Sequence, residues 1–167
     1  MALLLQQADV LAIRRISSTI NADRFNSFAK EAEEVHLRML LGDALYLDLI
    51  SNIEDAKYVT LLAGENYKKP DGFWVKYFGI KIYLAYAWLF INTIEGDEFQ
   101  ANIGSINFNQ QNAPLVKGKS NASAKYQDSM IIYKNNIIDY LNENAETYPL
   151  WQSTNREPRG KYIFDII

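Results

Sequence analysis

The chain has 167 residues, of which 49% are hydrophobic, 13% aromatic and 22% charged, and its formal net charge is −3. This composition suffices for one domain with a real core, and the charge argues against binding nucleic acid through its phosphates, which usually requires a basic face. The absence of cysteine excludes disulfides and thiolate metal sites and fits a reducing compartment.

Neither a signal peptide nor a membrane span is expected. Residues Met1–Leu5 contain no basic region and no long apolar stretch. The most apolar run, Ile82–Ile94, is far shorter than the roughly 20 residues that cross a bilayer. We therefore expect no membrane among the partners of this chain.

The N-terminal part of the chain predicts two helices. A short one covers Ala8–Arg15, and a second begins at the N-cap Asn21, with Asp23 favourable in its first turn. Behind this cap an apolar stripe recurs at helical spacing, and charged residues cover the opposite side. The stripe comprises Phe25, Phe28, Ala32, Val35 and Met39, widened by Ala29, His36 and Leu40, and the charged side comprises Lys30, Glu31, Glu33 and Glu34. Gly42 then stops or bends this helix.

The middle of the chain predicts two shorter helices and a long one. The short patterns cover Ala44–Ile50 and Asp55–Gly64, and Pro70-Asp71-Gly72 is a turn signal. The segment Phe73–Ile94 is apolar nearly all round and rich in aromatic residues. A helix with this pattern is buried, so we expect it at the centre of the fold.

The residues Glu95–Glu98 predict a turn, and the composition of the chain changes after them. Apolar residues alternate with Gln, Asn, Gly and Ser up to Phe108, which indicates a β-hairpin or an extended loop that orders only on contact. Residues Asn109–Asn121 are polar and predict a loop. A last long helix, capped by Ser120 or Ser123, then reaches about Ala145. Its apolar stripe comprises Tyr126, Met130, Tyr133, Ile137 and Leu141.

Together these patterns predict a mainly α fold, a bundle of about four to five helices with an inserted hairpin or loop and an extended C-terminal tail. The helical domain covers residues 1–148, with the insertion at about residues 97–119. Residues 149–167 form the C-terminal extension.

Two motifs that could carry chemistry fail on closer inspection. His36 is the only histidine and lies in the middle of a predicted helix. A helical zinc site would need a second histidine one turn away, and a catalytic histidine would need a nucleophile near it, and neither is evident. A core or boundary histidine is the better interpretation. Gly118-Lys119-Ser120 resembles the end of a phosphate-binding loop, but Ala113 replaces the required glycine and Pro114 removes an N–H donor.

The carboxylates predict a solvated surface rather than a catalytic pair. Glu31, Glu33 and Glu34 follow the polar face of a helix, and Asp97 and Glu98 follow a turn. No stretch places oxygen ligands at the spacing of a calcium loop. We therefore expect no enzyme and no cofactor or metal.

Two apolar segments lack an obvious place in the core and are candidate protein interfaces. The segment around Phe99–Phe108 forms either a hairpin on its own domain or an arm that reaches a neighbouring subunit. The C-terminal tail either folds back as an edge strand or docks on another chain. The candidate interface residues are Phe99, Ile103, Ile106, Phe108, Trp151, Tyr162, Phe164 and Ile166.

The order of these elements resembles the head–tail connector proteins of tailed bacteriophages, especially phages of Bacteroidetes-type hosts. The resemblance covers residues Ala8–Trp151 and is carried mainly by core and turn residues. The segments that carry it are Glu33–Leu37, Leu40–Tyr46, Leu61–Tyr67, Gly79–Ala87, Tyr140–Asn144 and Tyr148–Trp151.

The resemblance implies a structural virion protein of the phage neck, assembled in the cytoplasm of the bacterial host. In such proteins small helical subunits form a ring, commonly twelvefold, that joins the portal to the next neck or tail component. Genomic DNA passes through the channel without sequence-specific binding, and a mildly acidic chain suits a channel that must not retain phosphates. Its partners would be copies of itself, the portal and the downstream neck or tail protein.

Other functions fit the same sequence. One is a free helical adaptor or regulator that binds a protein segment in a groove beside the aromatic helix. Within the virion, a tail-completion ring or a stopper protein is a further alternative.

For the connector function, deletion of Pro158–Ile167 is expected to abolish assembly onto the portal while the monomer stays helical.

Overall fold

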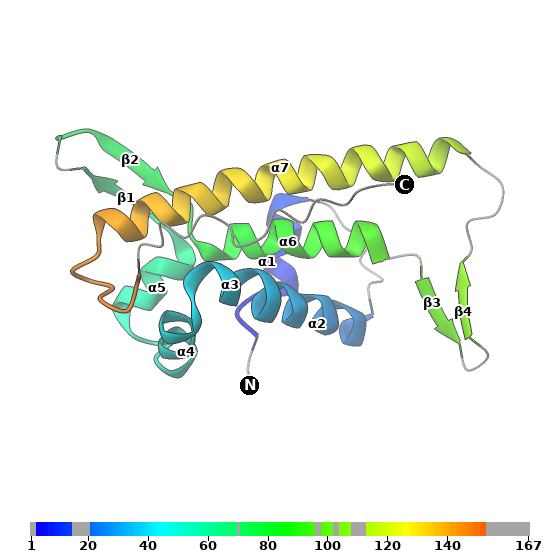
Figure 1. Cartoon of the computed structure of the whole chain (residues 1–167), viewed down its shortest axis with the longest axis horizontal. Helices are drawn as coiled ribbons and strands as arrows, with labels where there is room; N and C mark the ends of the chain where they lie inside the picture. The colour runs from blue at the N-terminus through cyan, green and yellow to red at the C-terminus, as the bar shows by residue number, and fades with distance from the viewer. Residues whose placement is uncertain are drawn as a thin grey trace.

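The structure is a computed structural model that describes residues 3–14, 21–69, 71–95, 98–101, 104–107 and 113–152 (Figure 1). It is mainly helical, which confirms the predicted fold class. The elements in chain order are α1 (Gln7–Ile13), α2 (Ala22–Glu31), the π-helix η1 (Ala32–Leu37), α3 (Arg38–Leu41), α4 (Asp43–Ser51), α5 (Ala56–Ala63), β1 (Glu65–Lys68), β2 (Trp74–Tyr77), α6 (Ile80–Glu95), β3 (Glu98–Ala101), β4 (Gly104–Asn107) and α7 (Ala113–Glu143).

Helix α6 is the centre of the core. It contacts α7 along much of its length and also packs on α1, α2, η1 and α5, with α7 on one side and α2–α3 on the other in Figure 1. Its buried side chains include Leu84 and Trp88. The Trp88 Nε1 donates a hydrogen bond to the carbonyl oxygen of Phe25 over 3.2 Å, so the largest core side chain is also satisfied.

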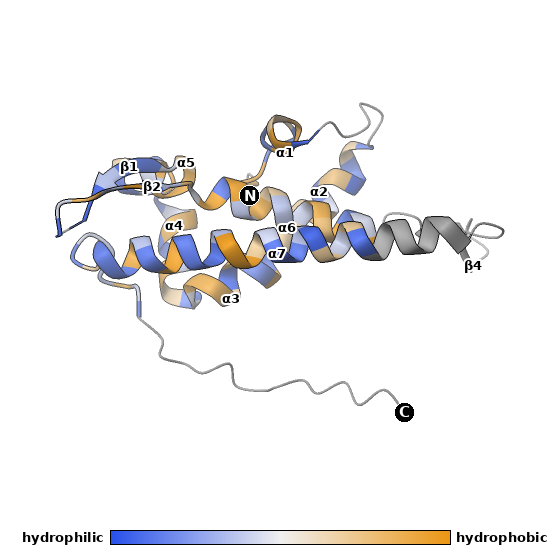
Figure 2. Ribbon diagram, turned by 90° about the horizontal axis from the view of Figure 1, so that it is seen from above, coloured by the Kyte–Doolittle hydropathy of each residue, from blue (hydrophilic) through white to orange (hydrophobic). Residues whose placement is uncertain are grey.

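Helix α7 confirms its predicted stripe but begins earlier than expected. Met130, Ile137 and Leu141 are buried, and hydrophilic residues alternate with hydrophobic ones around the helix in Figure 2. The loop predicted over residues 109–121 is wrong from Ala113 onward, because α7 starts there. Proline is tolerated in a first turn, whose N–H groups have no helical partner. A glycine costs a helix interior only about 1 kcal/mol relative to alanine, which a 31-residue helix can absorb.

The second predicted helix is present, but its buried face shifts partway along. Asn21 caps it as expected, accepting a hydrogen bond from the Asp23 amide over 2.8 Å. Beyond Glu33 the buried residues are Leu37 and Leu41, whereas the predicted stripe residues Val35 and Met39 are exposed, Met39 by 80%. The reason is η1, because a wider i→i+5 turn contains more residues, so each residue advances less around the helix axis and the buried positions fall later in the sequence.

The long helix predicted over Phe73–Ile94 begins only at Ile80. Its first residues instead form β2, which pairs with β1 in an antiparallel hairpin in the register Glu65↔Tyr77 to Lys68↔Trp74. Asp71 and Gly72 of the predicted turn lie between the two strands. Two backbone hydrogen bonds of 2.9 Å connect the described residues here, from Lys69 N to Phe73 O and from Gly72 N to Lys69 O.

A second hairpin occupies the predicted insertion. Strands β3 and β4 pair antiparallel, and Phe99 lies opposite Ile106. This segment is therefore a hairpin rather than an extended loop. No helix in the described part of the chain is both long and apolar enough to cross a membrane.

Candidate interaction surface on the β1–β2 hairpin

The β1–β2 hairpin presents one face to the protein and one to solvent. In its register, Tyr67 pairs with Val75 and Glu65 with Tyr77, and Tyr67 and Tyr77 pack toward α7. Successive strand residues point to opposite faces. The pairs Lys68↔Trp74 and Asn66↔Lys76 therefore form the outer face, and all four residues are exposed.

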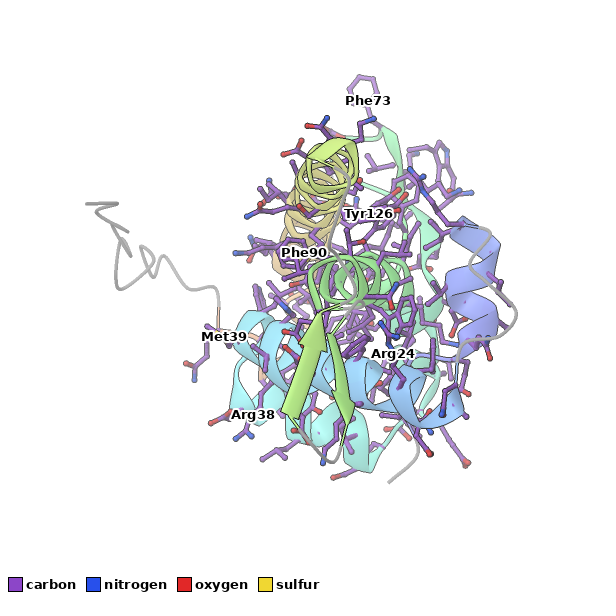
Figure 3. All side chains as sticks on the ribbon, turned by 90° about the vertical axis from the view of Figure 1, so that its right-hand side faces the viewer. Arg24, Arg38, Met39, Phe73, Phe90 and Tyr126 are labelled. Atoms are coloured by element: carbon purple, nitrogen blue, oxygen red, sulfur yellow. The ribbon has the colours of Figure 1, made fainter. Side chains whose placement is uncertain are left out.

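The hairpin also carries the two large aromatic side chains that are most exposed among the described residues, with Trp74 on this outer face and Phe73 beside the turn. Phe73 and Trp74 are each 71% exposed. Figures 1 and 2 show the hairpin projecting beyond the C-terminal end of α7, and in Figure 3 the Phe73 ring points away from the rest of the molecule. Exposed tryptophan on a projecting element is typical of protein interfaces, where it supplies a large part of the binding energy. We use the name hairpin face for the outer-face residues Asn66, Lys68, Trp74 and Lys76 together with Phe73, which is exposed beside the turn.

Two glycines at the base of the hairpin allow its two ends to approach closely. A Cβ on Gly64 would lie 2.5 Å from the Tyr77 carbonyl oxygen, and a Cβ on Gly79 would lie 2.5 Å from that of Leu62. Both glycines also have positive φ, +87° and +86°, a region that side chains disfavour. Only glycine at both positions lets α5 end and α6 begin against one another, and this fixes where the hairpin emerges.

Tyrosines hold the inner face of the hairpin on the bundle. The Tyr77 ring stacks on Tyr140 of α7 with centroids 3.9 Å apart and planes 6° apart. Its hydroxyl donates to the Leu61 carbonyl oxygen over 2.8 Å, and the Tyr140 hydroxyl donates to Glu65 Oε1 over 2.6 Å. Burial, and then the hydrogen bond to Glu65, raise the pKa of Tyr140, so it remains a neutral donor.

Helix α7 also bonds directly to the edge of β2. Asn136 Oδ1 accepts from the Phe78 amide over 3.0 Å, and its Nδ2 donates to the Lys76 carbonyl oxygen over 3.1 Å. One amide side chain thus satisfies both a donor and an acceptor on this edge, as a third strand would. Near the turn, Lys69 Nζ lies 2.7 Å from Glu143 Oε1. The hairpin is therefore positioned along its whole length while its outer face stays free.

The interface residues predicted from the sequence are distributed differently. Trp151 is only 8% exposed, and its Nε1 donates to Asn142 Oδ1 over 2.8 Å. It therefore packs in the core of its own chain. Phe99 of β3 and Ile106 of β4 are partners in the strand register. The remaining predicted residues, Ile103, Phe108, Tyr162, Phe164 and Ile166, lie outside the described residues.

The sequence did not identify the hairpin face because Phe73 and Trp74 were included in a buried helix. Burial alternates along β2, with Trp74 and Lys76 exposed and Val75 and Tyr77 turned inward. The residue types do not show this alternation, because three of the four are apolar or aromatic, and the only local signal for a hairpin is the adjacent turn.

One predicted surface carboxylate is buried instead. Glu33 is 4% exposed, and its Oε1 accepts a hydrogen bond from the Leu5 amide over 3.0 Å. Desolvation raises the pKa of Glu33, and the backbone N–H groups of Leu5 and Leu4 oppose this shift. The prediction of a solvated carboxylate is wrong because Glu33 lies one turn after the buried Ala29, on the inward side of the helix, where it binds the Leu5 amide and holds the segment before α1.

The other residues considered for catalysis, phosphate binding or metal binding do not form such a site among the described residues. His36 is partly buried on η1, and burial lowers its pKa. Gly118, Lys119 and Ser120 lie within α7 rather than in a loop, so they have no phosphate-binding geometry. Within the described ranges, no three acidic or histidine side chains gather closely enough to hold a metal ion.

The comparisons with known proteins give a family but no activity. The model of a family described as a family of unknown function, DUF6712, matches residues 37–90 and 107–160. No curated protein and no solved structure matches the chain. The two matched segments lie on either side of the β3–β4 hairpin and contain α4, α5, the β1–β2 hairpin, most of α6 and all of α7. Since they cover more than half of the sequence, the chain belongs to the DUF6712 family.

Proposed function

We propose that the chain is a structural protein of a tailed-phage virion, which forms a ring in the neck between the portal and the next neck or tail component. The resemblance of its sequence to head–tail connectors motivates this proposal. The observation that carries it is the hairpin face, with Phe73 and Trp74 each 71% exposed on a firmly held hairpin. A side chain of this kind left in water is the usual mark of an assembly surface.

The position of the hairpin suits a ring. A contact between two different surfaces of identical subunits repeats from copy to copy until its rotation closes. A projecting element at one side of the subunit supplies one of the two surfaces. The net charge of −3 is compatible with DNA sliding through the channel of such a ring, because basic walls would retain phosphates.

A free adaptor that binds a peptide beside the aromatic helix fits less well. That function needs aromatic side chains of α6 open to a groove, whereas Tyr83 and Trp88 are buried by the surrounding helices. The most exposed aromatic side chains of the described residues are instead Phe73 and Trp74 of the hairpin face. A tail-completion ring or a stopper protein differs from a neck ring in its position in the virion rather than in its subunit fold.

Negative-stain electron microscopy of the purified protein tests this proposal, with and without the portal protein encoded in the same genome. We expect closed rings, or portal particles that gain an additional layer. A monomer that does not bind the portal under either condition would contradict the proposal and favour the adaptor. An additional layer at the far end of the tail would instead indicate a tail-completion protein.

A further inference from the structure

We propose that the hairpin face of one copy docks on the α4–α5 corner of a second copy of this chain. The α4–α5 corner is defined here as Leu47, Glu54, Asp55 and Val59. This inference rests on the proposed ring and names its subunit contact. It follows from the charge, the exposed apolar residues and the positions of the two surfaces.

The hairpin face is cationic and aromatic. Lys68 and Lys76 flank Trp74, and neither forms an ion pair with another described residue. Lys76 Nζ lies 5.0 Å from the centroid of the Phe78 ring. The nearby Asp71 accepts a hydrogen bond from the Phe73 amide over 3.1 Å and forms no ion pair with Lys68 or Lys76.

The α4–α5 corner is acidic and carries exposed apolar side chains. Residues 43–55 contain four acids and no Lys or Arg. Two of these are engaged, Asp43 by Arg38 over 2.7 Å and Asp48 by Lys57 over 3.6 Å. The other two, Glu54 and Asp55, are exposed and form no ion pair with the described residues.

Apolar residues on the corner complement the aromatic residues of the hairpin. Leu47 is exposed on α4, and Val59 is exposed one turn after Asp55 on α5. A buried Trp or Phe covers about 150–250 Å², so Phe73 and Trp74 could supply an aromatic centre for the contact. The Lys–carboxylate pairs would form a polar rim around it, as in interfaces generally.

The two surfaces lie where neighbouring ring subunits would meet. Figure 1 places both at the same end of the molecule, with the hairpin on one side of the C-terminal end of α7 and α4–α5 on the other. A copy displaced sideways and rotated about the long axis therefore brings its α4–α5 corner to the hairpin of its neighbour. Because the two surfaces differ, every copy offers one of each, and the contact continues around a ring.

Charge reversal of each surface, alone and together, tests this pairing by sedimentation velocity of the full chain. We expect the wild type to assemble and both Lys68→Glu/Lys76→Glu and Glu54→Lys/Asp55→Lys to sediment as monomers. The four-fold variant, with both reversals, should recover assembly because opposite charges face each other again. Lys125→Glu/Lys134→Glu on α7 is the matched control, since it changes the same charge at two exposed lysines and should leave assembly intact.

A second variant removes the apolar part of the contact. Trp74→Ser should also give monomers, and circular dichroism should show unchanged helicity because Trp74 is exposed. Assembly that survives the hairpin variants, or fails equally in the α7 control, would overturn the hairpin contact while leaving the ring proposal standing. A wild type that stays monomeric at its highest soluble concentration would also overturn this contact, whereas the ring proposal is then judged by the portal particles.

Discussion

Alanine at Gly64 should destabilise the protein more than alanine at Gly42. The two glycines are closely matched, since Gly42 has φ 77° and ψ 157° and Gly64 has φ 87° and ψ 163°. Each also ends a helix, and each amide donates to the carbonyl oxygen four residues earlier, over 2.9 Å and 2.8 Å. They differ in what surrounds the added methyl group.

The structure gives the expected size of this difference. Both positions lie in a backbone region that is nearly reserved for glycine, so alanine costs roughly 1–3 kcal/mol at either. At Gly42 no atom lies within 4 Å of the new Cβ, whereas at Gly64 the Tyr77 carbonyl oxygen would be 2.5 Å away. Overpacking of this kind adds about 1–3 kcal/mol. The free energy of unfolding should therefore fall further in Gly64→Ala, by at least about 1 kcal/mol.

Urea denaturation followed by circular dichroism measures both losses. The dependence of the free energy of unfolding on urea should be the same in both variants, because a single methyl group changes little of the surface exposed on unfolding. Equal destabilisation of the two variants would refute the reasoning. It would mean that the close approach of Gly64 and Gly79 does not set the position of the hairpin.

Three further changes test individual contacts. Asn136→Ala should lower the free energy of unfolding by about 1–3 kcal/mol, since two hydrogen bonds are lost. Hydrogen exchange at the Phe78 amide should also accelerate. Unchanged exchange would contradict the hydrogen bond between Asn136 and this amide. The pKa of Glu33 is raised in the folded protein, so protonated Glu33 contributes to stability. This contribution is fully present below the ordinary pKa of 4.5 and is lost as pH rises through the raised pKa. The stability of wild type relative to Glu33→Gln should therefore fall with rising pH in denaturation experiments, and a constant difference would contradict its burial. The hydrogen bond from Tyr58 is the main cause of the lowered pKa of Asp48, so Tyr58→Phe should raise that pKa in a carboxyl NMR titration, and an unchanged pKa would rule this bond out as the cause.

The fold class could be predicted because its main signals are local. The Asn21 cap, the stop at Gly42 and the α7 stripe each depend on a few neighbouring residues, and the structure contains all three. The helices α4 and α5 also fall where the sequence placed them. Caps and helical periodicity express backbone hydrogen bonding and burial directly, so they can be interpreted without knowledge of the partners.

The shift of the buried face at η1 could not be predicted from periodicity. A stripe calculated at 3.6 residues per turn continues to Val35 and Met39, and the π-helix instead turns Leu37 and Leu41 inward. The insertion of a wide turn depends on tertiary packing, including the hydrogen bond that the Leu5 amide donates to Glu33. Glu33 itself lies one helical turn after the buried Ala29, and its burial depends on this partner from a distant segment.

The hairpin face was missed because a continuous run of apolar and aromatic residues favours a buried helix. Phe73 and Trp74 look like core residues by composition, yet both are exposed, Phe73 beside the turn and Trp74 on the outer face of β2, in a hairpin whose base requires glycine at positions 64 and 79. The requirement for glycine at both positions arises from a contact between residues 15 apart in sequence. Such contacts are outside what a local pattern can report.

The most direct test of assembly through the hairpin is native mass spectrometry of the full chain and of Trp74→Ser at equal concentrations. We predict one dominant closed oligomer for the wild type and monomers for Trp74→Ser. The same oligomer in both proteins would show that the hairpin face is not the subunit contact, and monomers in both would contradict self-assembly through it.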